Sequence, residues 1–124
     1  MRALIVDDSR PMRTMMGRMV AELGFAVGHA ADGIDALAQL EQDGRPDVVL
    51  LDWNLPDMNG FTILNAIRAD PRWSDLPVIV VATATERSQL ARVLDHAMSE
   101  CLIKPFTKED LHGKLGQVGV LSVI

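Results

Sequence analysis

Val48-Val49-Leu50-Leu51-Asp52 runs through four aliphatic residues into a single carboxylate, and the turn-rich segment 53–60 follows directly. A short aliphatic run bounded by turn residues is typical of a strand buried on both faces of a parallel sheet. A charge at the end of such a strand lies where the sheet stops and a crevice begins. Asp52 is therefore a candidate functional residue, and a simple turn cap is the alternative interpretation.

Strand-like and helix-like segments alternate along the rest of the chain. Apolar runs predict strands, and apolar positions at helical spacing, with capping residues before them, predict helices. The expected strands are 3–6, 25–30, 48–52, 77–82 and 101–103. The expected helices lie between Ser9 and Gly24, between Asp32 and Gly44, over 61–69, over 87–97, and after Thr107.

This alternation predicts the α/β fold class, with one domain over residues 1–124. Strand-helix units joined by short loops form a doubly wound, five-stranded parallel sheet with helices on both faces, which is a three-layer sandwich. Strand order 2-1-3-4-5 is one of several doubly wound arrangements, and the pattern alone leaves the choice open.

Polar residues follow the expected strands. Asp7 and Asp8 follow the first strand, Asp52 ends the third, Ala82-Thr83 ends the fourth and Lys104 follows the fifth. In doubly wound sheets ligands bind at the carboxyl ends of the strands, so order 2-1-3-4-5 would make these residues neighbours.

Three carboxylates at one rim favour a phosphoryl-accepting site. Without a cation they would repel one another, and a hard, oxygen-liganded ion such as Mg²⁺ removes that conflict. Lys104 carries a compact charge suited to a phosphate oxygen, and a carboxylate such as Asp52 can act as the nucleophile in phosphoryl transfer. The alternative is three capping aspartates and a surface lysine.

Composition narrows the class of protein. The chain has 124 residues, of which 48% are hydrophobic, and its net charge of −5 argues against sequence-independent nucleic-acid binding. A single cysteine excludes an internal disulfide and fits a reducing cytoplasm. The first apolar run is too short for a signal peptide, and no run approaches the ~20 apolar residues that span a membrane. We expect a monomeric cytoplasmic protein without a membrane or nucleic-acid partner.

Three motifs at separate strand ends resemble the receiver domain of bacterial two-component response regulators, in particular its single-domain chemotaxis type. The resemblance covers nearly the whole chain and implies a flavodoxin-like fold with strand order 2-1-3-4-5. The motifs are Leu4-Ile5-Val6-Asp7-Asp8-Ser9, Leu50-Leu51-Asp52-Trp53-Asn54-Leu55-Pro56 with Asn59-Gly60, and Lys104-Pro105-Phe106.

The resemblance also implies a role for each motif residue. Asp52 would accept a phosphoryl group from a histidine kinase or phosphotransfer protein, and an unidentified output protein would read the change. The cofactor would be Mg²⁺, held by Asp7, Asp8, Asp52 and the backbone carbonyl of Asn54. Lys104 would contact the phosphoryl group, and the peptide bond from Lys104 to Pro105 would be cis. The output would be binding, so the protein would not be an enzyme in the ordinary sense.

Two positions depart from the family pattern. Ala82 stands where the family has a switch hydroxyl, and Thr83, one residue later, would replace it only if the strand end shifts, which also reverses the side-chain direction. Cys101 stands where the family has a switch aromatic residue. The alternative function is therefore a receiver-fold interaction module whose switching is weak or independent of phosphorylation. A flavodoxin-like redox protein is disfavoured, because the aspartates after the first strand would repel a flavin phosphate.

Overall fold

Five parallel strands form a single sheet in the order β2-β1-β3-β4-β5. The computed structural model describes residues 1–90 and 98–121. The strands are β1 (Arg2–Val6), β2 (Ala26–Ala30), β3 (Val48–Asp52), β4 (Val78–Ala82) and β5 (Ser99–Ile103). The fold class and the strand order implied by the resemblance are both confirmed.

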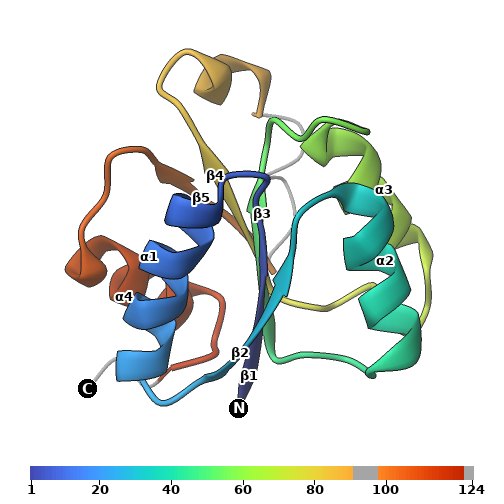
Figure 1. Ribbon diagram of the computed structural model, residues 1–124, viewed down its shortest axis with the longest axis horizontal. Coiled ribbons are helices and arrows are strands. Elements are labelled where there is room, and N and C mark those ends of the chain that lie inside the picture. The colour runs from blue at the N-terminus through green and yellow to red at the C-terminus, as the bar shows by residue number, and fades with distance from the viewer. Residues whose placement is uncertain (91–97, 122–124) are drawn as a thin grey trace.

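Helices cover both faces of this sheet and complete three layers (Figure 1). One face is covered by α1 (Arg10–Glu22) and α4 (Lys108–Gln117), and the other by α2 (Gly33–Gln42) and α3 (Gly60–Ala69). The winding reverses between β1 and β3, the position at which such sheets open a crevice. None of the helices in the described ranges has the length and apolar character needed to cross a membrane.

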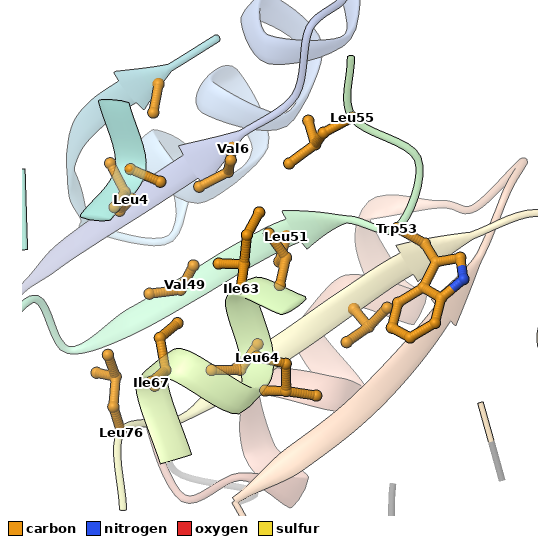
Figure 2. Packing of buried hydrophobic residues seen from close by; sticks show 14 of the residues in the cluster. Leu4, Val6, Val49, Leu51, Trp53, Leu55, Ile63, Leu64, Ile67 and Leu76 are labelled. Carbon is orange, nitrogen blue, oxygen red and sulfur yellow. The ribbon is translucent and has the colours of Figure 1, made fainter. Parts of the chain in front are cut away.

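The aliphatic residues of β3 pack into the hydrophobic core on both faces of the sheet. Val49 and Leu51 pack on the α2–α3 face, whereas Val48 and Leu50 pack on the α1–α4 face, and all four are at most 1% exposed. Figure 2 shows Val49 and Leu51 beside the apolar side of α3. Side chains alternate between the faces of a strand, so a central strand covered on both sides has to be apolar at every position.

Local capping explains where the helices begin. Ser9 caps α1 by accepting a hydrogen bond from the Met12 amide, and Asp32 caps α2 by accepting from the Asp35 amide. Thr107 starts α4 in a reciprocal capping box with Asp110. These three helix starts are confirmed, because a short polar side chain satisfies an amide that lacks a partner within the helix.

The region after β4 differs from the expected helix over 87–97. The chain forms a 3₁₀ helix, η1 (Glu86–Gln89), while residues 91–97 of that prediction lie outside the described residues. Thr85, the residue before η1, makes no capping hydrogen bond, whereas the hydroxyl of Thr83 accepts one from the Glu86 amide at 3.3 Å. Short 3₁₀ turns of this kind are frequent at helix ends and in connections.

β5 begins two residues earlier than expected, at Ser99. The guanidinium of Arg68, at the end of α3, donates to the Ser99 hydroxyl at 2.7 Å and to the carbonyl of Met98 at 3.1 Å. It also donates to the carbonyl of Leu76 at 2.7 Å, just before β4. The contact supplies a partner for the buried hydroxyl of Ser99, which pairs with Val78 of β4 in the sheet.

Candidate functional site

Three aspartates meet at the carboxyl ends of β1 and β3. Each offers one carboxylate oxygen, and these oxygens all lie within 4.8 Å of one another. Asp7 is 1% exposed and Asp52 is 4% exposed, whereas Asp8 is exposed to solvent. The apolar strands hold the two buried carboxylates at the rim because neither strand can shift without exposing its aliphatic residues.

Lys104 faces this carboxylate cluster from the end of β5. Its Nζ atom lies 3.4 Å from Asp52 Oδ1 and 3.8 Å from Asp7 Oδ2. Its backbone amide donates to the Ala82 carbonyl at 2.9 Å, which ties the residue to the end of β4. The Lys104–Pro105 peptide bond is cis, the geometry that the resemblance implied.

The positive charge of Lys104 compensates the buried carboxylates only in part. Burial, together with the nearby charge of Asp7, raises the pKa of Asp52 to about 6, and Lys104 and the Asn54 amide oppose that rise. Burial also raises the pKa of Asp7, although the Ser9 amide and Lys104 oppose the shift. Both carboxyl groups are therefore harder to ionise than in water, and Lys104 offsets the cost of burying their charges only in part.

The residues present fit a divalent cation. Asp7 Oδ2 is buried and has no hydrogen-bond partner among the residues that the structure describes. A buried carboxylate oxygen without a donor is costly, and a hard cation is the partner that satisfies it. The cluster of Asp7, Asp8 and Asp52 supplies oxygen ligands alone, as Mg²⁺ prefers.

The loop after Asp52 carries the expected carbonyl ligand, Asn54. The Asn54 amide donates to Asp52 Oδ1 at 3.4 Å, and Asn54 pairs with Asn59 in an isolated antiparallel bridge. The Asn59 side chain in turn caps α3 by accepting from the Thr62 amide. Asn54 therefore belongs to a closed loop that stays next to the cluster.

The end of β4 brings no threonine hydroxyl to Asp52 in this structure. Ala82 is fully buried and pairs with Ile103 of β5 in the sheet. Thr83 is exposed and is bonded to Glu86: the Thr83 amide donates to the Glu86 carboxylate at 2.8 Å, and the Thr83 hydroxyl accepts from the Glu86 amide at 3.3 Å. The strand end is thus in the ungapped register, which leaves Ala82 at the position where the resemblance implies a switch hydroxyl.

Cys101 lies within the core of the α2–α3 face and is 8% exposed. Burial raises the pKa of its thiol, so the protonated form is favoured. The side chain therefore behaves as a small apolar residue.

Sequence reasoning missed Asp57. The segment 57–60 was interpreted as a plain turn, but the Asp57 carboxylate accepts hydrogen bonds from the amides of Gly33 and Ile34, both at 3.0 Å. An acidic residue in a turn gives no signal of a helix start that lies more than twenty residues away, so no pattern in the sequence identifies this contact.

Comparison with known proteins agrees with this geometry. The family model described as the response regulator receiver domain matches residues 3–116. The chemotaxis protein CheY1 of Helicobacter pylori strain J99 is 33% identical over 116 residues, which cover 93% of this chain and 94% of that protein. CheY of Pseudomonas aeruginosa is 36% identical over 119 residues, which cover 95% of both proteins.

Solved structures give the same result. CheY4 of Vibrio cholerae matches with a TM-score of 0.83 and 34% identity, covering 94% of this chain and 97% of that one. The response regulator TrrA of Thermotoga maritima, solved in complex with Mg²⁺ and BeF, matches with a TM-score of 0.81 and 27% identity, again covering 94% and 97% of the two chains.

Proposed function

This chain belongs to the response regulator receiver family, and we propose that it signals by accepting a phosphoryl group on Asp52. The donor would be the phosphohistidine of a histidine kinase or phosphotransfer protein. The observation that carries the proposal is the meeting of the oxygens of Asp7, Asp8 and Asp52 within 4.8 Å. Lys104 stands beside them, with its Nζ 3.4 Å from Asp52.

The chemistry follows from the charges at the rim. A carboxylate oxygen of Asp52 attacks phosphorus, the phosphorus–nitrogen bond breaks, and the imidazole nitrogen keeps the electron pair and takes a proton from solvent. Because the pKa of Asp52 is about 6, most of the nucleophile is ionised at neutral pH. Lys104 would pair with an oxygen of the transferred group and so stabilise its charge.

The divalent cation in this proposal is Mg²⁺, held by Asp7, Asp8, Asp52 and the backbone carbonyl of Asn54. When bound, it supplies charge neutralisation for the transferring oxygens. Two observations support this assignment: Asp7 Oδ2 is buried without a hydrogen-bond donor in the described residues, and burial and the charge of Asp7 raise the pKa of Asp52.

The proposed output is the binding of a second protein, with no separate substrate to turn over. The match to chemotaxis proteins at 33% and 36% identity supports a chemotaxis-type role. In this proposal the protein acts as a monomer in the cytoplasm, without a nucleic-acid or membrane partner. The alternative is an interaction module of the same fold whose switching is weak or independent of phosphorylation. The second experiment below, by amide NMR, distinguishes it from a phosphorylation-dependent switch.

Intact-mass measurement tests the acceptor. Incubation with acetyl phosphate and Mg²⁺ should add one phosphoryl mass to the parent protein and none to an Asp52→Asn variant. The control variant is Asp35→Asn, an exposed aspartate of α2, which should gain the mass as the parent does. An Asp52→Asn variant that is modified at the parental rate would overturn the assignment.

Amide NMR tests the switching. Spectra with and without beryllofluoride and Mg²⁺ should show shifts that extend from the rim to Cys101 and to α4. Shifts confined to the residues around Asp52 would instead indicate a module that binds phosphate without transmitting the change.

A further inference from the structure

The loop between β3 and α3 is bound to the start of another helix through one carboxylate. Asp57 Oδ1 accepts from the Gly33 amide and Asp57 Oδ2 from the Ile34 amide, each at 3.0 Å. Gly33 and Ile34 open α2, so these amides have no partner within their own helix. A negative charge at this position also interacts favourably with the helix dipole. Asp57 thus binds both amides at once.

Close packing reinforces this contact. A Cβ atom added to Gly33 would lie 2.6 Å from Met58 Cγ and 2.8 Å from Ile63 Cδ1, closer than real side chains approach. The absence of a side chain at Gly33 lets the residue after Asp57 lie directly against α2. The loop therefore touches α2 through two neighbouring residues.

The same loop is closed on its other side. The Gly60 amide donates to the Trp53 carbonyl at 2.8 Å, and Asn54 pairs with Asn59 inside this closure. A Cβ at Gly60 would lie 2.9 Å from Trp53 Cα, so the two ends of the loop are in direct contact. Between the closure and α2, residues 53–60 have little freedom to move.

We propose that Asp57 is a positioning residue that holds this loop against α2 and thereby keeps the Asn54 carbonyl in place for the divalent cation. The inference rests on the proposed function insofar as that function places Mg²⁺ at the aspartate cluster. Asp57 acts through the loop: in the structure its carboxylate is bonded to α2. Its loss removes the anchor to α2 and leaves the closure at Trp53 and Gly60 to hold the loop that carries Asn54, so the cation must order a ligand that is otherwise already ordered.

Magnesium affinity, without any phosphodonor, is the readout. MgCl₂ is titrated into the metal-free protein and followed by Trp53 fluorescence and by calorimetry, since Trp53 directly follows Asp52. Asp57→Ala should raise the dissociation constant about tenfold, the smaller of the effects known for residues that support metal ligands. Asp57→Ser, whose short hydroxyl cannot bond both amides, should also raise the dissociation constant for Mg²⁺. It replaces Asp57→Ala in the experiment if the alanine variant does not fold.

Two further variants separate position from charge. Asp57→Asn removes the charge and keeps the shape and one acceptor oxygen, so its affinity should lie closer to that of the parent than to that of Asp57→Ala. Asp35→Ala removes a charge from the first turn of the same helix without touching the loop, and its affinity should match that of the parent.

Two outcomes would overturn the proposal. One is a dissociation constant for Asp57→Ala and Asp57→Ser equal to that of the parent. The other is an equal loss of Mg²⁺ affinity in Asp35→Ala and Asp57→Ala, because the loss of a negative charge near α2 would then explain both changes. The two proposals can fail separately. If Asp52 is not a phosphoryl acceptor, the parent protein gains no phosphoryl mass, yet its Mg²⁺ affinity still depends on Asp57 as expected.

Discussion

Lys104 Nζ lies 3.4 Å from Asp52 Oδ1, although the strands that carry these residues, β5 and β3, are separated by β4. The lysine side chain therefore passes over the end of β4 to reach the acceptor carboxylate. Lys104 and β4 are joined there by the bond from the Lys104 amide to the Ala82 carbonyl. One ammonium group thus faces two buried carboxylates, and the pKa of Asp52 is raised by burial first and by the neighbouring charge of Asp7 second.

Removing the Asp52 charge should stabilise the protein in a pH-dependent manner. The pKa of Asp52 rises from 3.8 to about 6 on folding, so the folded state binds the proton more tightly than the unfolded state does. That contribution to stability is complete below pH 4 and is lost as the pH rises through about 6, a change of roughly 3 kcal/mol. Asp52→Asn should therefore raise the free energy of unfolding by more near pH 7.5 than near pH 4.5.

Urea denaturation in EDTA at the two pH values measures this difference. Added MgCl₂ should reduce it, because a bound cation relieves the same repulsion. An equal gain in stability at both pH values would contradict the assigned pKa.

Loss of the Lys104 ammonium should have opposite effects on metal binding and on phosphoryl acceptance. In Lys104→Ala the pKa of Asp52 should rise further, because a favourable charge is lost, and Mg²⁺ should bind more tightly, because a competing cation is gone. Acceptance of phosphate from acetyl phosphate should slow about a hundredfold, as expected when a group that stabilises developing charge is removed.

Carboxyl NMR titration and intact-mass kinetics measure these effects. The control is Lys114→Ala on α4, whose ammonium pairs with Glu100 at 2.9 Å. This variant should match the parent in both measurements, and parental kinetics in Lys104→Ala would contradict the role of Lys104.

The hydroxyl of Thr83 should be dispensable for phosphoryl acceptance. The hydroxyl accepts a hydrogen bond from the Glu86 amide at the start of η1, and Thr83 lies just beyond Ala82, the last residue of β4. Thr83→Ala should leave the rate of mass gain unchanged and should affect only the stability of the segment that begins at Glu86. A markedly slower rate in Thr83→Ala would mean that the strand end shifts by one residue when Asp52 is phosphorylated.

Glycine should be required at position 60 and not at position 113. A Cβ at Gly60 would lie 2.9 Å from Trp53 Cα and 3.1 Å from the Trp53 carbonyl oxygen, so the backbone beside Asp52 would have to move. Gly60→Ala should lower the free energy of unfolding by about 2 kcal/mol, as is usual for overpacking. A Cβ at Gly113 meets open space on α4, so Gly113→Ala should stabilise the protein by up to about 1 kcal/mol. Urea denaturation compares the two variants, and equal stabilities would show that the loop adapts.

Much of the fold follows from the sequence because the relevant interactions are local. An aliphatic run such as Val48–Leu51 needs burial on both faces, and that requirement alone indicates a parallel sheet between helix layers. Capping is local as well, since Ser9, Asp32 and Thr107 each bond an amide three residues ahead. The positions of the carboxylates at the strand ends are predictable for the same reason, because each directly follows or ends an aliphatic run.

The tertiary structure alone decided the features that depend on distant parts of the chain. The strand order places β1 between β2 and β3, and no local preference encodes that choice. Asp57 bonds amides 23 and 24 residues away, and the buried hydroxyl of Ser99, at the start of β5, finds its partner in the distant Arg68. The register at Ala82 is likewise set by its pairing with Ile103 on a neighbouring strand. Local chemistry therefore determined which residues end the strands, whereas non-local hydrogen bonding and packing determined which of those residues meet.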